Sequence, residues 1–153
     1  MRPIIRIAET PEAFFRLIRL REEVFVVEQG VPIGIELDDE DDRAIHFIAT
    51  VKKEVVGTAR LIIRRRSGKI GRMAVRKEWR GKSIGTALIG FIIKLSERKR
   101  LTVLTLHAQE PAVSFYARLG FVAEGERFYE AGIPHRKMAL QTNSRRKSDR
   151  MGG

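Results

Sequence analysis

The stretch EWRGKSIGTALIGFIIKL, residues 78–95, decides the fold prediction because a basic glycine turn leads directly into an apolar helical pattern. Its Gly-Lys-Ser at positions 81–83 contains the residues that close a nucleotide-binding P-loop. A P-loop also requires a glycine five positions before Gly81, and Arg76 stands there. The spacing therefore excludes a P-loop and leaves a strand, a short turn and a helix.

This turn still has the chemistry of a phosphate site. The first N–H groups of a helix have no acceptor within the helix and lie at the positive end of its dipole. Such groups bind phosphate, and Arg80 and Lys82 add full positive charges beside them. The alternative is an ordinary helix start with Ser83 as its N-cap. The turn alone does not separate the two interpretations.

Composition limits the class of protein. A chain of 153 residues that is 43% hydrophobic corresponds to about one domain with a substantial core. It contains no cysteine, which excludes a disulfide framework and a thiolate metal site. The longest apolar run, residues 87–93, is too short to cross a bilayer, and the N-terminus has no signal-peptide pattern. We therefore expect a cytoplasmic protein without a membrane span.

The net charge of +11 raises the question of nucleic-acid binding. Aromatic residues interleaved with the basic ones, or a basic recognition helix, are missing from the sequence. Instead, positive charge concentrates in RRRSGKIGR (64–72) and RKEWRGK (76–82). This distribution favours a small polyanionic cofactor over nucleic acid.

Hydrophobic periodicity predicts strands and helices that alternate along the chain. Strands are expected at 4–8, 44–53, 54–66, 69–77, 101–107 and, after 121, as a pair joined by a turn at 131–134. Helices are expected at 11–27 with a break, 84–95 and 111–120. Residues 28–42 are predicted to form a loop, Ser67-Gly68 a hairpin turn, and residues 142–153 a basic, disordered tail.

Three segments together resemble the GNAT superfamily of acetyl-CoA-dependent N-acyltransferases. RGKSIG (80–85) is similar to its Arg/Gln-x-x-Gly-x-Gly/Ala signature, with Ser83 in place of the middle glycine. AQEPAVSFYARLGF (108–121) is similar to a later block of the family, with Gln109 in place of asparagine, and EVVGTARLIIRRRSGKIGRMAV (54–75) resembles its long hairpin. LREEVFVVEQGVPIGIELDDEDDRAIHF (20–47) and FYEAGIPHRKMAL (128–140) resemble the narrower ElaA/YjcF-like branch.

The resemblance implies an α/β (α+β) fold for residues 1–141, with a mixed, mostly antiparallel sheet of about seven strands and helices on both faces. It also implies acetyl-CoA as co-substrate, whose pantetheine arm pairs with the fourth strand, and an oxyanion donor near the Val75 N–H. Lys82 or Arg76 would meet the 3′-phosphate. The implied cofactor-binding residues are Met73, Ala74, Val75, Arg80, Gly81, Lys82, Ser83, Ile84, Gly85, Thr86 and Gln109.

Acetyl transfer to an amine requires a base, an oxyanion donor and an acid for the leaving thiolate. Tyr116 matches the family's general acid, although the residue could equally be a core aromatic. The fourth strand offers no glutamate as base, so His107 and His135 are the candidates. His46 and a water relay from an acidic group are the alternatives.

The acidic run IELDDEDD (35–42) is a candidate acceptor site, because Glu36, Asp38 and Asp39 would attract a cationic amine such as a polyamine, an amino sugar or a lysine side chain. The competing interpretation is a solvated surface loop. The run lacks the spacing and glycine of an EF-hand, so no metal is predicted. The sequence is compatible with a homodimer.

Two other classes of function remain open. The early RLREEVFVVEQG (19–30) is similar to acyl-homoserine-lactone synthases, which use an acyl carrier protein, although RGKSIG favours coenzyme A. The third hypothesis is a non-catalytic module that binds coenzyme A or another polyanion.

Overall fold

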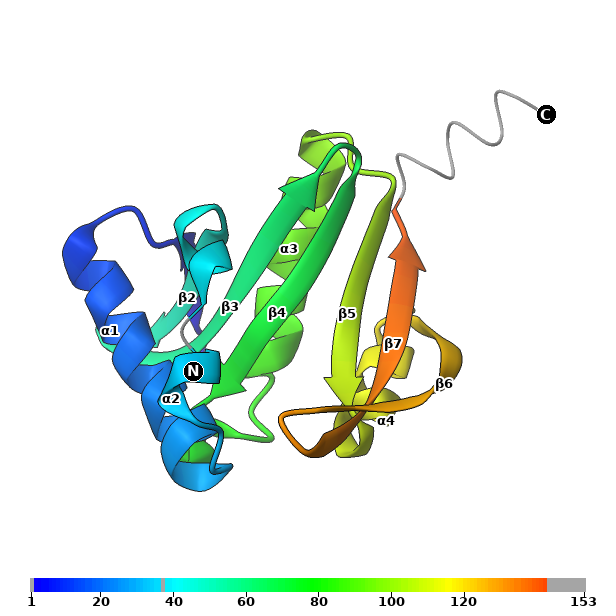
Figure 1. Cartoon of the computed structure of the whole chain (residues 1–153). Coiled ribbons are helices and arrows are strands. Elements are labelled where there is room, and N and C mark those ends of the chain that lie inside the picture. The colour runs from blue at the N-terminus through cyan, green and yellow to red at the C-terminus, as the bar shows by residue number, and fades with distance from the viewer. Residues whose placement is uncertain (1, 37, 143–153) are drawn as a thin grey trace. The chain divides into compact units, whose positions relative to one another are not determined.

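The structure is a computed structural model that describes residues 2–36 and 38–142 (Figure 1). Seven strands are hydrogen-bonded in the order β1-β2-β3-β4-β5-β7-β6. The β1–β2, β2–β3, β5–β7 and β6–β7 pairs are antiparallel, whereas β4 and β5 are parallel. The predicted mixed, mostly antiparallel sheet of seven strands is therefore confirmed.

The chain forms two compact units. The first comprises Met1–Ile62 and Gly71–Phe91, and the second comprises Ile63–Ile70 and Ile92–Gly153. The first contains β1 (Ile4–Ile7), α1 (Pro11–Arg21), the π-helical η1 (Glu22–Glu28), α2 (Ile33–Glu36), the 3-10 turn η2 (Asp39–Asp42), β2 (Ile45–Val51), most of β3 (Glu54–Arg64), the end of β4 (Ser67–Val75), η3 (Lys77–Trp79) and the start of α3 (Ile84–Arg98). The second holds the remainder of β3, β4 and α3, with β5 (Val103–Gln109), η4 (Glu110–Ala112), α4 (Val113–Arg118), β6 (Val122–Glu130) and β7 (Ile133–Gln141).

The first helix begins where the sequence predicts. The Thr10 hydroxyl accepts a hydrogen bond from the Ala13 N–H at 3.1 Å, and Pro11 occupies the first turn, where its missing N–H costs nothing. The helix does not stop at Arg21 but continues as the π-helical η1. The break expected within residues 11–27 is thus a change of helix type.

Two local predictions were wrong. The predicted loop at 28–42 contains α2 and η2, and η2 begins because the Asp38 carboxylate accepts from the Glu40 N–H at 3.1 Å in a capping box. The β3–β4 turn lies at residues 65–66, and Ser67 belongs to β4. In this turn Arg65 takes a left-handed φ of 57°, a conformation that glycine adopts more readily.

Thr142, the first residue of the predicted tail, is described by the structure. Thr142 is buried, and its N–H donates to the Thr102 carbonyl at 3.1 Å. The remainder of the predicted disordered tail, residues 143–153, lies outside the described residues.

Helices cover both faces of the sheet within the first unit. Leu17, Leu20 and Val24 pack in one apolar cluster with Ile48 of β2. The neighbouring residue, Phe47, contacts Phe91 of α3 edge-on at 5.8 Å between ring centroids. Since adjacent strand residues point to opposite faces, α1 and α3 lie on opposite sides of β2.

A β-bulge in β3 controls how closely α3 can approach. Ala49 pairs with Gly57, but Thr50 pairs with Val55, which leaves Val56 as the extra residue. The extra residue reverses the alternation, so Val55 joins the α1 cluster while Gly57 faces α3. A Cβ atom built on Gly57 would lie 2.8 Å from Ile84 Cγ2. Glycine is therefore required for this contact between β3 and the first turn of α3.

We expect Gly57→Ala to lower the free energy of unfolding by about 1–3 kcal/mol, because the added methyl group overpacks the β3–α3 contact. Gly90→Ala is the matched control, since Gly90 is a helical residue whose added Cβ would meet nothing within 4 Å. That variant should gain about 0.5–1 kcal/mol. Urea denaturation of both proteins measures the difference, and equal stabilities would contradict this role for Gly57.

Candidate functional site

The turn between β4 and α3 has two left-handed residues. Gly81 has φ of 74° and Ser83 has φ of 65°. The Ser83 carbonyl accepts from the Ala87 N–H at 3.1 Å, which starts the helix. The N–H groups of Ile84, Gly85 and Thr86 are consequently first-turn donors, without acceptors inside α3. The helix start is thus well formed, and the binding of an anion by its first N–H groups stays a prediction.

Basic side chains flank this turn, and two of them, Arg80 and Arg76, are paired with glutamates. Arg80 Nε donates to the Val75 carbonyl at 2.9 Å, and its Nη2 lies 2.9 Å from Glu28 Oε2. Arg76 lies 2.8 Å from Glu54. Lys82 instead lies over the Trp79 ring, with Nζ 5.2 Å from its centroid. Of the two residues predicted to meet the 3′-phosphate, Lys82 is therefore the less neutralised.

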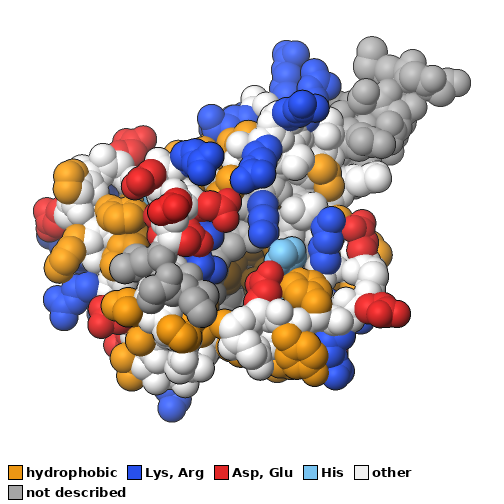
Figure 2. All heavy atoms as spheres, in the orientation of Figure 1, with side chains coloured by type: hydrophobic (Ala, Val, Ile, Leu, Met, Phe, Trp, Pro, Cys, Tyr) orange, Lys and Arg blue, Asp and Glu red, His pale blue; other side chains and the backbone are white. Residues whose placement is uncertain are grey.

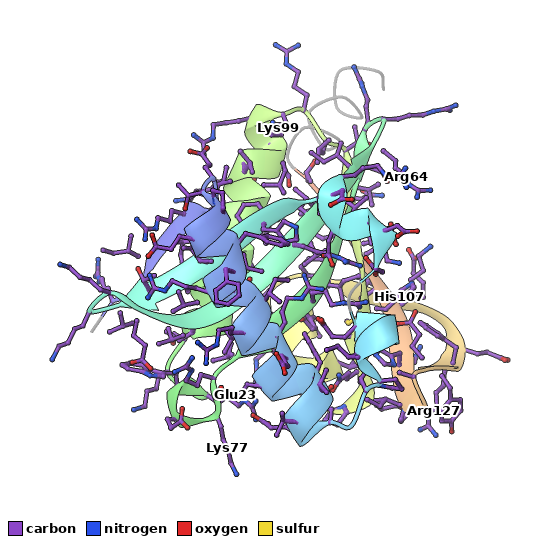
Figure 3. The ribbon with its side chains drawn as sticks, turned by 60° about the vertical axis from the view of Figure 1, so that its left-hand side comes forward. Glu23, Arg64, Lys77, Lys99, His107 and Arg127 are labelled. Carbon is purple, nitrogen blue, oxygen red and sulfur yellow. The ribbon has the colours of Figure 1, made fainter. Side chains whose placement is uncertain are left out.

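The end of β4 leads directly into this turn. Ala74 is buried in the cluster beneath α1, whereas Met73 and Val75 are only half-buried and point to the other face. Glu23 and Lys77, labelled in Figure 3, come from η1 and from η3 immediately after β4. Glu23 Oε2 is 3.5 Å from Arg76 Nε, so a partly exposed ion pair links η1 to the residue that follows β4.

Most of the basic segment 64–72 lies in a different unit from the basic segment 76–82. RKEWRGK belongs to the first unit, whereas Arg64, Arg65, Arg66 and Lys69 are exposed at the β3–β4 hairpin of the second. Figure 2 shows Lys and Arg side chains gathered at this hairpin. We therefore assign to the turn only the charges of RKEWRGK.

Tyr116 lies on α4 in the second unit and is 7% exposed. Its ring contacts Phe115 and Phe121 edge-on, with centroids 5.0 and 5.9 Å away. Burial raises the pKa of the Tyr116 hydroxyl to about 12. The hydroxyl thus keeps its proton throughout the neutral range. Tyr116 is therefore a core aromatic residue, and its hydroxyl also carries the proton that a general acid requires.

The two candidate bases share a glutamate that sequence reasoning missed. Glu130 Oε1 lies 2.5 Å from His107 Nδ1, and Glu130 Oε2 lies 4.0 Å from His135 Nε2. Leu106 and Ala108 are buried while His107 and Gln109 are partly exposed, so His107 and Gln109 share a face of β5 as predicted. The paired register places His135 directly opposite Gln109. The structure thus brings His107, His135 and Gln109 together in the second unit.

The acidic run is neutralised from within the first unit. Arg21 Nε lies 2.6 Å from Glu36 Oε1, and Arg21 Nη1 lies 2.8 Å from Asp41 Oδ1. Arg60 Nη1 lies 2.8 Å from Asp38 Oδ1 and 2.9 Å from Asp41 Oδ1. Arg72 Nη2 adds a contact of 3.0 Å with Asp38. We call these three arginines and three carboxylates the arginine network.

The arginine network changes the chemistry expected of the loop. Arg21 and Glu36 are 1% and 2% exposed, so neither reaches solvent. Glu36 and Asp38, two of the three predicted acceptor ligands, have internal partners, and Asp39 is the exposed member. Asp39 is therefore the one of these three predicted acceptor ligands that is exposed to solvent. The role of all three residues toward an acceptor stays a prediction.

Titration of Asp41 reflects this pairing. Burial by itself would raise the pKa of the Asp41 carboxyl, but hydrogen bonds and charges from Arg21 and Arg60 outweigh burial and lower the pKa to about 2. His46 Nε2 donates to the Asp41 carbonyl, 2.9 Å away, and burial lowers the pKa of the His46 ring. His46 is thus part of the support for the loop, which leaves His107 and His135 as the candidate bases.

Comparison with known proteins identifies the family. A family profile described as an acetyltransferase (GNAT) domain matches residues 11–142. The chain belongs to the GNAT acetyltransferase family. It is 32% identical over 133 residues to the N-acetyltransferase YjcF of Bacillus subtilis, covering 86% of this chain and 95% of that protein. This GNAT chain is accordingly an enzyme, an N-acetyltransferase.

Solved structures agree with this GNAT assignment. ElaA of Escherichia coli superposes with a TM-score of 0.77 and 26% identity, covering 91% of this chain and 99% of ElaA. An aminoglycoside 6′-N-acetyltransferase complexed with coenzyme A has a TM-score of 0.72 at 17% identity, over 90% of this chain and 96% of the other, and shows the shared fold alone. The predicted resemblance to the ElaA/YjcF-like branch is confirmed.

Across residues 2–36 and 38–142, no helix is long and apolar enough to cross a membrane. The same part of the chain holds no group of three or more His, Asp or Glu side chains arranged to hold a metal ion.

Asp41→Asn should lower the free energy of unfolding at pH 7 by about 3 kcal/mol, because Arg21 and Arg60 lose a buried partner. The native carboxyl has a pKa below its ordinary 3.8, so its contribution is present above pH 4 and is lost as the pH falls toward 2. Denaturation at pH 7 and at pH 2.5 measures the loss, which should be smaller at the lower pH. Asp42→Asn, at an exposed position, is the control, and equal losses in the two variants would contradict the network.

Ser83 should be better replaced by glycine than by a larger residue, since its φ lies in the left-handed region. We expect Ser83→Gly to bind acetyl-CoA at least as tightly as the native protein, and Ser83→Val to bind at least 10-fold more weakly. Calorimetric titration measures both affinities. Tighter binding by the valine variant would show that this turn does not hold the cofactor.

Proposed function

We propose that this protein transfers the acetyl group of acetyl-CoA to a primary amine within a ternary complex. The observation that supports the proposal most directly is the turn at Gly81 and Ser83, where two left-handed residues leave the first N–H groups of α3 available to an anion. Membership of the GNAT family and the coenzyme A bound by the aminoglycoside acetyltransferase support the same ligand.

In this proposal the pyrophosphate of acetyl-CoA lies on the N–H groups of residues 81–86. Arg80 and Lys82 screen its charge, and the pantetheine arm runs along Met73, Ala74 and Val75. The remaining predicted cofactor contact, Gln109, lies in the second unit. Acetyl-CoA supplies the activated acyl group, and the protein's own groups bind it and move protons.

The reaction joins a neutral amine to the thioester carbonyl carbon. The amine nitrogen forms a C–N bond, the C–S bond breaks, and the thiolate of coenzyme A accepts a proton. We assign that proton to the Tyr116 hydroxyl, which burial keeps protonated at neutral pH. The proton that the amide nitrogen loses restores Tyr116. Tyr116 therefore ends each turnover in its starting state.

The acceptor is proposed to be a small amine or a lysine side chain. Asp39 lies exposed at the start of η2, where it can attract a cationic group. An acyl-carrier-dependent synthase is the competing enzyme class, and a module that binds coenzyme A without turnover is the non-catalytic alternative. Each predicts a different outcome in the same assay.

The test is a panel of amines, including polyamines, amino sugars and lysine peptides, with free coenzyme A as the readout. We expect turnover with acetyl-CoA and at least one amine. Turnover only with an acyl carrier protein would favour the synthase, whereas binding of acetyl-CoA without turnover on any amine would favour the non-catalytic module. Either result would overturn the proposal.

Tyr116→Phe should lower kcat on the best amine by about 100-fold, because general acid catalysis typically contributes that much or more. Affinity for acetyl-CoA should change less than 3-fold, since only a hydroxyl group is removed. Phe115→Leu on the same helix is the control for disturbed packing. An unchanged kcat in the Tyr116 variant would remove the acid role from this residue.

A further inference from the structure

We propose that His107 is the general base of the transfer and that Glu130 is the residue that positions it. This inference rests on the proposed acetyl transfer and names the group that prepares the amine. Sequence alone left the base open between His107 and His135. The two rings differ in the acceptor that each Nδ1 contacts and in the exposure of the side chain.

Glu130 fixes the tautomer of His107. A carboxylate can only accept, so the contact of 2.5 Å between Glu130 Oε1 and His107 Nδ1 places a proton on Nδ1. In the neutral ring Nε2 then carries the lone pair, which is the atom that can accept a proton from an amine. The Phe128 ring contacts His107 edge-on at 4.9 Å between centroids, and this contact restricts the ring from the side. The arrangement is that of a base held in its active tautomer.

His135 is engaged differently. Its Nδ1 donates to the Ile133 carbonyl at 2.7 Å, and its ring stacks on Phe128 at 6.0 Å with an interplanar angle of 23°. The His135 side chain is 9% exposed, against 28% for His107. His135 thus supports the β6–β7 hairpin that carries Glu130, whereas His107 is the more exposed of the two side chains.

The location of His107 on β5 also suits a base. The parallel register of β4 and β5 runs from Ser67–Val103 to Ile70–Leu106, and His107 is the next residue. On its own strand the flanking Leu106 and Ala108 are buried, so the imidazole projects from the opposite face. The backbone of His107 is therefore held in a regular strand. Its side chain lies one residue beyond the last pair in the β4–β5 register.

Several charged groups share this face with His107. Lys137 of β7 is directly opposite His107, Glu124 of β6 is opposite Lys137, and Lys69 of β4 pairs with Thr105. Among these charged groups, Glu130 is the one in hydrogen-bond contact with the His107 ring.

The step balances as a single proton transfer. An acceptor enters as R–NH3⁺, and one N–H bond breaks as its proton passes to His107 Nε2, giving R–NH2 and an imidazolium paired with Glu130. The amine lone pair then forms the C–N bond described above. His107 returns its proton to solvent, which accounts for the one net proton released in each turnover.

The first test uses long-range ¹H–¹⁵N spectra of the imidazole rings and needs no substrate. We expect neutral His107 in the native protein to carry its proton on Nδ1, and to lose this preference in Glu130→Ala. A native His107 with its proton on Nε2 would overturn the inference, whatever the enzyme acetylates.

The second test follows kcat/KM against pH. His107→Gln should lose at least 100-fold at pH 7, with the deficit shrinking as the pH approaches the pKa of the amine, because the acceptor then deprotonates unaided. Glu130→Gln should shift the acid limb to lower pH, since a neutral amide no longer favours the imidazolium. Affinity for acetyl-CoA should stay within 3-fold in both, which shows that the variants are folded.

Glu126→Gln is the matched control, because Glu126 is an exposed glutamate on the same strand as Glu130. It should leave the pH profile unchanged. An unaltered profile in His107→Gln, or an equal shift in both glutamate variants, would overturn the inference while leaving acetyl transfer intact. A native enzyme without turnover on any amine would instead overturn the proposed function.

Discussion

The arginine network is the interaction on which the arrangement of the first unit depends. Arg21, Arg60 and Arg72 come from α1, β3 and β4, and their guanidinium groups converge on Glu36, Asp38 and Asp41. Buried ions are tolerated only with partners, so the loop must fold against these three elements before any of the charges can be enclosed. The network therefore fixes an acidic loop that would otherwise repel itself.

The turn at the start of α3 depends on a second constraint, the space between β3 and the helix. The bulge at Val56 directs Gly57 toward Ile84, the first residue of α3. This contact sets where the helix begins, while the left-handed Gly81 and Ser83 bring the chain to it from the end of β4. Packing and backbone conformation together leave the first N–H groups of α3 at the end of a strand, as a phosphate cradle requires.

Much of the fold could be predicted because local patterns agreed with tertiary structure. The Thr10-Pro11 cap, the apolar spacing of α3 and the alternation in β5 each lead to the observed element. The arginine partners of the acidic run were harder to predict, because they lie far from it in the sequence and no local pattern indicates them. Arg60 and Arg72 were the available signal, because they are charged residues inside strands. A charged side chain that is buried in a strand needs a counter-ion.

In the candidate site, too, some residues could be predicted from local sequence and others could not. Residues 80–86 could be assigned from sequence because the turn, its glycines and its charges are contiguous. Glu130 could not, because its relation to His107 depends on the strand order β5-β7-β6 and on the irregular β6–β7 register between Glu124 and Phe128. His107 and Glu130 are 23 positions apart in the sequence. Their contact depends on the irregular strand register, so the local sequence pattern does not predict it. The acid at Tyr116 was assigned from the family motif alone.

The central claim, that acetyl-CoA binds at the turn before α3, is tested most directly by backbone ¹H–¹⁵N spectra recorded while acetyl-CoA is added. The account predicts that the largest shifts occur at the amides of residues 73–75 and 81–86, and that they saturate together. Saturable shifts confined to the exposed basic hairpin at Arg64–Lys69, with residues 81–86 unchanged, would contradict it.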